Sequence, residues 1–203
     1  PCVHHPPEPA RGRAGRVLEW LMAPTIALLT DFGLQDPYLG AMKGAILTVC
    51  PQATLVDLVH EIPAHDVLAG ALALDACYGA FPEATVFLAV VDPGVGTPRR
   101  PIAVAAGRWR FVAPDNGLLS LVVSADPGAR AHLIANPALA RVPDSPVYHG
   151  RDLFRPAAAH LARGLPLAEV GPAVPTSTLV RLEIPPSERT SDGWQGRVLR
   201  ADR

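Results

Sequence analysis

The residues best suited to chemistry lie in one loop, where Asp92 is followed by a Pro-Gly-x-Gly turn and then by Arg99 and Arg100. The run before it, residues 85–91, is strongly apolar and is typical of a buried strand. Glycines allow such a loop to approach a ligand closely. A carboxylate beside a guanidinium stays ionised, and the pair can hold and polarise a water molecule. The loop alone fits a tight turn with a structural salt bridge equally well.

Two further segments carry polar side chains next to predicted elements. His149 lies just before a predicted helix and can serve as a hydrogen-bonding partner or a base, although a single histidine is more often structural. Asp31 follows the apolar run 26–29, and a carboxylate at a strand end can accept both hydroxyls of a ribose. Asp36 can instead cap the next helix, and Asp115-Asn116-Gly117 can be a simple turn.

A binuclear metal site is a second possibility for these residues. Asp31, His60, Asp92 and His149 are all of types that bind divalent metals. The spacing of His60 and His65 matches no known metal motif, so we interpret both as loop residues and predict no metal and no cofactor.

Strand and helix patterns alternate along the chain and must position these side chains. Apolar runs at 26–29, 54–59 and 85–91 alternate with helical patterns at 38–49, 66–78 and 153–163, and 102–105 and 110–112 are expected to pair across a Gly turn. This alternation predicts an α/β fold, with a mainly parallel central sheet and helices on both faces. Sites of such folds lie at the carboxyl ends of the strands, where Asp31, Asp92 and Asp115 fall.

Composition narrows the class of protein. Hydrophobic residues make up 49% and charged residues 18% of the 203 positions, so a sizeable core is expected. The net charge of -1 shows no basic surplus for nucleic acid, and no apolar run is long enough to span a membrane. Three cysteines without CxxC spacing fit a reducing compartment, so we expect a cytoplasmic protein.

Composition also divides the chain into four parts. Residues 1–21 are rich in Pro, Arg and His and are expected to be a disordered or non-native extension, with Met22 as the natural start. We expect a catalytic α/β domain at 22–172, a Pro-, Ser- and Thr-rich linker at 173–192, and the truncated start of a β domain at 193–203, with a strand over 194–200.

Five segments taken in order resemble the adenosine-forming S-adenosylmethionine hydrolases, or S-adenosylmethionine hydroxide adenosyltransferases, which are related to fluorinases and chlorinases. The matching stretches are LLTDFGLQDPYLGAMKGAI, VDLVHEIPAHDVLAGA, FPEATVFLAVVDPGVGTPRR, FVAPDNGLLS and YHGRDLFRPAAAHLARG. Five ordered motifs are far more specific than any one of them.

The resemblance implies roles for individual residues. A water-activating triad maps to Asp92, Arg99 and His149, with Arg100 as the alternative arginine. The ribose-binding carboxylate maps to Asp31. Substrate-lining positions map to Asp36, Tyr38 and Asn116, and a methionine-binding position maps to Asp202.

The resemblance also implies an assembly and a chemistry. Relatives are homotrimers that carry a C-terminal β-barrel domain, which is absent or truncated here. Fluorinase-like relatives have an uncharged Tyr and Thr in the first loop and a Ser near the second motif, where this chain has Asp92, Val95 and Gly150. Hydrolysis of S-adenosylmethionine is therefore the leading hypothesis. Halogenase-like substitution, a metal-dependent hydrolase and a non-catalytic nucleoside-binding domain are the alternatives.

Overall fold

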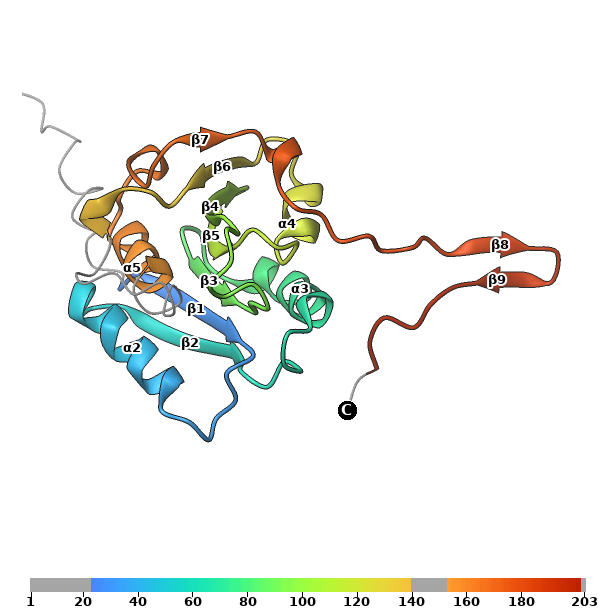
Figure 1. The fold of residues 1–203 in the computed structure, drawn as a ribbon, viewed down its shortest axis with the longest axis horizontal. Coiled ribbons are helices and arrows are strands. Elements are labelled where there is room, and N and C mark those ends of the chain that lie inside the picture. The colour runs from blue at the N-terminus through green and yellow to red at the C-terminus, as the bar shows by residue number, and fades with distance from the viewer. Residues whose placement is uncertain (1–22, 140–152, 202–203) are drawn as a thin grey trace, which may run out of the picture.

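A seven-stranded mixed sheet forms the centre of the molecule in the computed structural model, which describes residues 23–139 and 153–201 (Figure 1). The strand order is β2-β1-β3-β5-β4-β6-β7. The first four strands run parallel and comprise β1 (Thr25–Thr30), β2 (Thr54–Val59), β3 (Val86–Val90) and β5 (Trp109–Pro114). The antiparallel half comprises β4 (Pro101–Ala106), β6 (Arg130–Leu133) and β7 (Ala173–Val174). The expected pairing of β4 with β5 across a Gly turn is confirmed, with Gly107 at φ +55°.

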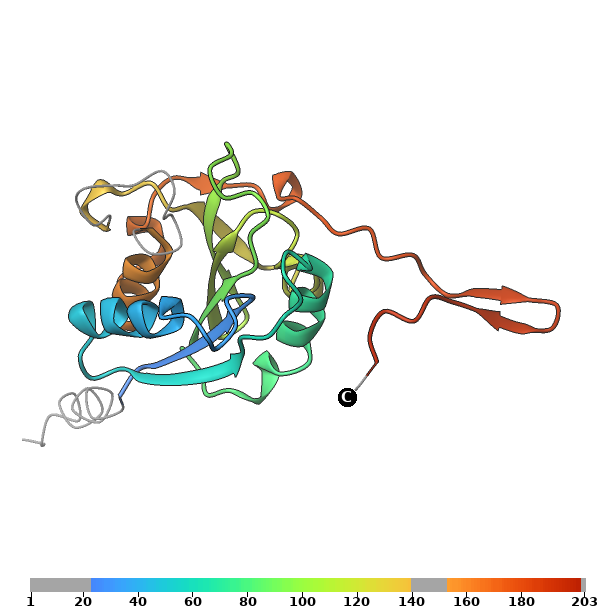
Figure 2. The same cartoon turned by 60° about the horizontal axis from the view of Figure 1, so that its bottom comes forward.

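Helices cover both faces of the sheet, as expected (Figure 2). One face carries α2 (Tyr38–Val49) and α5 (Arg155–Ala162). The other carries α3 (Val67–Asp75) and α4 (Ser120–Ala125). None of the helices in the described ranges is both long and apolar enough to cross a bilayer.

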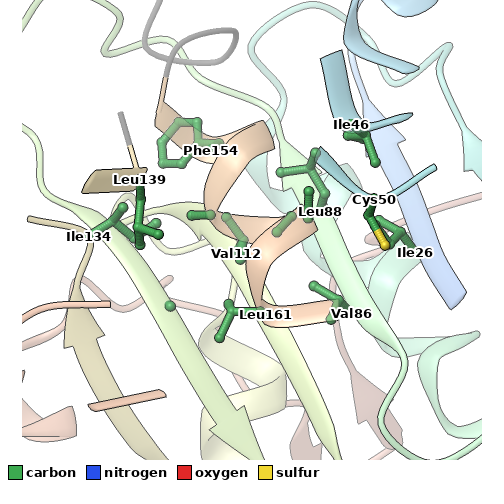
Figure 3. Close-up of a cluster of buried hydrophobic side chains, with 14 of the residues drawn as sticks. Ile26, Ile46, Cys50, Val86, Leu88, Val112, Ile134, Leu139, Phe154 and Leu161 are labelled. Carbon is green, nitrogen blue, oxygen red and sulfur yellow. The ribbon is translucent and has the colours of Figure 1, made fainter. Parts of the chain in front are cut away.

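Strand β3 is apolar at every position because both of its faces are covered. In β3, Val86 and Leu88 point into the cluster beneath α2 and α5, which Figure 3 shows, whereas Phe87 and Ala89 point into the cluster beneath α3 and α4. Side chains alternate between the faces of a strand, so two buried faces require a continuous apolar run. The core therefore fixes where β3 ends, and Asp92 lies just beyond that end.

Asp36 and Asp66 are the two aspartates expected to cap a helix, and only Asp66 does so. Asp66 caps α3, because its Oδ1 accepts a hydrogen bond from the Ala69 backbone N–H at 2.9 Å. By contrast, α2 begins after Pro37 without a side-chain cap. The capping alternative for Asp36 is therefore wrong, and this exposed side chain remains available for another role.

The C-terminal part of the described chain first packs on the sheet and then leaves it. Residues 173–182 fall within the expected linker, yet β7 pairs with β6 and Leu179 is buried. Beyond them the chain extends into a two-stranded arm, which stands away from the body in both views (Figures 1 and 2). Its strands are β8 (Glu188–Thr190) and β9 (Gly193–Gln195), so the strand expected over 194–200 ends earlier.

Candidate active site

Three carboxylates lie just past the ends of three parallel strands. Asp31 follows β1, Asp92 follows β3 by two residues, and Asp115 follows β5. Because parallel strands end at the same edge of a sheet, all three belong to one edge, as predicted. Asp92 and Asp115 are buried, whereas Asp31 is half-buried.

Asp92 and Arg99 form a buried ion pair. The Arg99 Nε donates to both carboxylate oxygens of Asp92, at 2.9 Å from Oδ1 and 2.7 Å from Oδ2, and Nη2 also contacts Oδ2. Only 3% of the Asp92 side chain and 7% of the Arg99 side chain are exposed. Charges this well buried are stable only as partners, so each fixes the position of the other.

The loop between the two residues is shaped for this contact. Gly94 donates its backbone N–H to Asp92 Oδ1 at 3.1 Å, and Thr97 Oγ1 donates to the Gly94 carbonyl at 2.7 Å. A Cβ on Gly94 would lie 3.2 Å from Arg99 Cγ, which is tighter than most real contacts. The glycine therefore allows the backbone to approach the ion pair, as the Pro-Gly-x-Gly pattern predicts.

One donor of Arg99 is not used within the described residues. Nη1 is buried and has no hydrogen-bond partner there, and Nη2 is close to Asp92 without hydrogen-bond alignment. The guanidinium lies 5.0 Å from the centre of the fully buried Phe154 ring, a cation–π contact. A buried, unpaired N–H carries a free-energy cost, so Nη1 is suited to an oxygen acceptor that enters the site.

The neighbouring arginine belongs to a different pair. Arg100 Nε donates to Asp115 Oδ2 at 2.8 Å, and its Nη2 donates to the Thr178 carbonyl at 2.5 Å. Asp115 Oδ1 accepts from the Val180 backbone at 2.9 Å. Arg100 thus ties residues 178–180 to the end of β5, while Arg99 remains the partner of Asp92.

The loops after β1 and β2 are joined around Asp31. Its Oδ2 accepts from the backbone N–H of His65 at 3.0 Å, and Gly33 N–H donates to the His60 carbonyl at 2.7 Å. His65 adopts φ +66°, a backbone conformation that few non-glycine residues take. One oxygen of Asp31 is therefore fixed, and Oδ1 has no hydrogen-bond partner among residues 23–139 and 153–201.

The other residues predicted to contact the substrate differ in whether their polar groups already have partners within the protein. Asp36 and Tyr38 are exposed, and the Tyr38 ring meets only Phe32 edge-on at 6.5 Å among ring contacts of the described residues. Asn116 uses its amide on the main chain, because Nδ2 donates to the Val91 carbonyl at 2.8 Å and Oδ1 accepts from Leu118 N–H at 3.2 Å. Asn116 thus holds the backbone beside Asp92. His149 and Asp202 lie outside the described residues.

His60 contacts Thr30 and Asp57 rather than the carboxylates of Asp31 and Asp92. Its Nδ1 lies 2.8 Å from Thr30 Oγ1, and its Nε2 lies 3.1 Å from Asp57 Oδ1 without hydrogen-bond alignment. Burial acts to raise the pKa of Asp57, but a hydrogen bond from Lys43 and the contact with His60 outweigh it, so the pKa is lowered. In the described ranges no three His, Cys, Asp or Glu side chains group around a point that could hold a metal. The proposed cluster of Asp31, His60 and Asp92 is thus not formed there.

Sequence reasoning missed three contacts that shape this site. Phe154 supports Arg99 from 55 positions away, His60 supports Thr30, and Asp115 selects Arg100. The order of the two arginines is the only local signal for the last of these, since adjacent residues of an extended chain point in opposite directions. The other two are tertiary contacts without a local pattern.

The comparison with family models decides the family. Residues 26–171 match the model described as the SAM hydroxide adenosyltransferase N-terminal domain. The chain belongs to this family. An (R)-S-adenosyl-L-methionine hydrolase of Thermus thermophilus is 46% identical over 88% of this chain, and one of Salinispora tropica is 46% identical over 89%. A fluorinase of an Actinoplanes species is 31% identical over 87%.

Two solved structures share this fold. A protein of Thermotoga maritima called uncharacterized and conserved superposes with a TM-score of 0.77 at 38% identity over 80% of the chain. A conserved hypothetical protein of Thermus thermophilus gives 0.67 at 47% identity over 80%. The family member described here spans 71% of the Thermus hydrolase and 62–63% of the two solved chains.

Proposed function

We propose that this protein hydrolyses S-adenosylmethionine to adenosine and methionine by attack of water on the C5′ carbon of the ribose. The observation that carries the proposal is the buried Asp92–Arg99 pair at the carboxyl edge of the parallel strands. The family match and the hydrolases at 46% identity support the same substrate.

The ion pair favours water over a halide as the nucleophile. Asp92 carries a negative charge where a halide would have to bind, and two like charges repel each other strongly in a buried site. A water molecule can instead donate a hydrogen bond to the carboxylate while its oxygen accepts one from Arg99 Nη1. This arrangement leaves an oxygen lone pair free to attack carbon.

Asp92 works mainly by orientation. Its two oxygens already accept hydrogen bonds from Arg99 Nε and from the Gly94 backbone, so the carboxylate is held in one orientation toward the water. Holding the nucleophile in line with the reacting carbon can supply about 7–11 kcal/mol of the barrier. His149, the third member of the proposed triad, completes the hydrogen bonding of the same water.

The leaving group makes general acid catalysis unnecessary. As the water oxygen forms its bond to C5′, the C5′–S bond breaks and its electron pair remains on sulfur. The sulfonium thereby becomes the neutral thioether of methionine, and the attacking water loses one proton to solvent. No cofactor or metal is required by this balance.

Substrate binding is assigned to the same edge of the sheet. Asp31 accepts the ribose hydroxyls through its unused oxygen, since the other is bound to His65 N–H. Asp36 and Tyr38 contact the substrate from the loop after β1. Asn116 lines the site while holding the backbone next to Asp92. Asp202 binds the methionine part.

We further propose that the protein acts as a homotrimer in the cytoplasm. The exposed arm supports burial against another domain or subunit, because Trp194 is 72% and Val198 82% exposed. No role in nucleic-acid or membrane binding is assigned.

The test is to incubate the full-length protein with S-adenosylmethionine, with and without added fluoride or chloride, and to separate the products by chromatography. We expect adenosine and methionine in equal amounts under all conditions. Asp92→Asn and Arg99→Gln should abolish both products, whereas the exposed control Asp75→Asn should retain them. A 5′-halogenated nucleoside as the main product would assign the protein to the halide branch instead.

A further inference from the structure

An open hollow of about 570 Å³ lies at the end of the sheet opposite to the candidate active site. Its lining includes four potentially cationic side chains, Arg108, Arg110, Arg130 and His132. Along β5, Arg110 is five residues from Asp115, which corresponds to about 17 Å. The hollow is therefore separate from the Asp92–Arg99 pair.

Strand register places two of the arginines on either side of a small residue. Ala105 of β4 pairs with Arg110 of β5 on one side and with Arg130 of β6 on the other. Directly paired residues of antiparallel strands point to the same face, so both arginines flank the Ala105 methyl group. Two strand spacings separate their backbones by about 10 Å. The small side chain leaves open space between the two guanidinium groups.

The charge in this hollow is only partly neutralised by the described residues, because one carboxylate, that of Glu83, also lines it. Arg108 pairs with Glu83 at 3.2 Å and lies 4.8 Å from the centre of the Trp109 ring. Arg110 and Arg130 make no side-chain hydrogen bond or ion pair within residues 23–139 and 153–201. Other arginines in these ranges, such as Arg99 and Arg100, have carboxylate partners.

His132 adds a third group with a fixed orientation. Its Nδ1 lies 2.8 Å from the carbonyl oxygen of Gly171. A carbonyl only accepts, so Nδ1 carries a proton and Nε2 is left for another partner. His132 lies on the same face of β6 as Arg130, two residues along the strand.

We propose that this hollow binds a small molecule that carries a di- or triphosphate group. Guanidinium groups match phosphate oxygens in bidentate geometry, and Arg110 and Arg130 line this hollow without ion-pair partners of their own among the described residues. The volume lies within the range of small-molecule sites. The site is independent of the proposed hydrolysis and does not require it.

Titration calorimetry of the full-length protein with inorganic pyrophosphate and, separately, with ATP tests the proposal. We expect saturable binding of at least one of them, which weakens as salt is added. Arg130→Gln and Arg110→Gln should each weaken it at least tenfold. Arg189→Gln, on the exposed arm, removes the same charge and should leave it unchanged. Tighter binding of ATP than of pyrophosphate would identify the ligand as a nucleotide, and equal binding would identify the phosphate chain alone as the recognised group.

The exposed position of Arg130 keeps the experiment decisive, because its replacement leaves the core intact even if Arg110→Gln folds poorly. The absence of measurable binding of either probe would overturn the proposal. Equal losses in Arg130→Gln and Arg189→Gln would overturn it too, since net charge alone would then account for the effect.

Discussion

Removing both partners of the buried Asp92–Arg99 pair should destabilise the fold by much less than the sum of the two single losses. In Arg99→Gln the carboxylate of Asp92, only 3% exposed, keeps its charge and loses its main partner. Leaving a buried charge unpaired costs about 3–5 kcal/mol, a large part of the 5–15 kcal/mol that typically stabilises a domain. Asp92→Asn should cost a similar amount, because Arg99 is then the unpaired charge.

The double variant Asp92→Asn/Arg99→Gln separates electrostatics from packing. Two neutral amides of similar size leave no buried charge, so the loss should be well below the sum of the single losses. A coupling free energy of about 2–3 kcal/mol is expected from this cycle. Activity should be absent from all three variants, because the proposed mechanism needs the charged pair itself.

Urea denaturation followed by fluorescence measures the three free energies of unfolding. Arg108→Gln is the control, since it removes the same charge from an ion pair at the surface. The Arg108 side chain is 54% exposed and that of its partner Glu83 is 74% exposed, so a smaller loss of stability is expected, with product formation retained per folded molecule. An Arg99→Gln variant whose free energy of unfolding lies within about 1 kcal/mol of wild type would refute the reasoning, because an unpaired buried charge should cost more than that.

Two further predictions concern stability alone. Gly171→Ala should destabilise the fold by about 1–3 kcal/mol, because its φ of +153° disfavours a side chain and a Cβ would lie 2.3 Å from the Leu133 carbonyl oxygen. Gly44→Ala, with open space around it in α2, should instead stabilise the fold by about 0.5–1 kcal/mol. Thermal unfolding measures both effects, and a Gly171→Ala variant more stable than Gly44→Ala would contradict this reasoning. Burial opposes ionisation of Asp57, but hydrogen bonding led by Lys43 lowers its pKa below the ordinary 3.8, so its contribution is present above that value and is lost as the pH falls through the lowered one. The stability difference between wild type and Asp57→Asn, from urea curves at several pH values, should shrink in acid, and a difference that does not change with pH would disprove the assignment.

The parts of the fold that depend on local pattern could be predicted from the sequence. The run 86–91 is apolar at every position because both faces of β3 are covered, and this pattern alone located the strand that ends before Asp92. The Asp66 cap follows from side-chain chemistry within one helical turn. The end of α2 is similarly local, since the helix ends at Val49, two residues before Pro51.

The parts of the fold that depend on contacts between distant residues could not be predicted from the sequence. β7 has only two residues, and it exists because it pairs with β6 some forty positions earlier. The expectation of a linker at this point rested on composition, which does not report such pairing. The support of Arg99 by Phe154 has the same origin, since each residue has an ordinary local environment and only the folded chain brings them together.

The central claim is that water, held by Asp92 and Arg99, attacks the C5′ carbon. The most direct measurement is mass spectrometry of the products formed by the full-length protein from S-adenosylmethionine in H₂¹⁸O. The account predicts one ¹⁸O atom in the 5′-hydroxyl of adenosine and none in methionine. Unlabelled adenosine, or label found only in the methionine fragment, would contradict it.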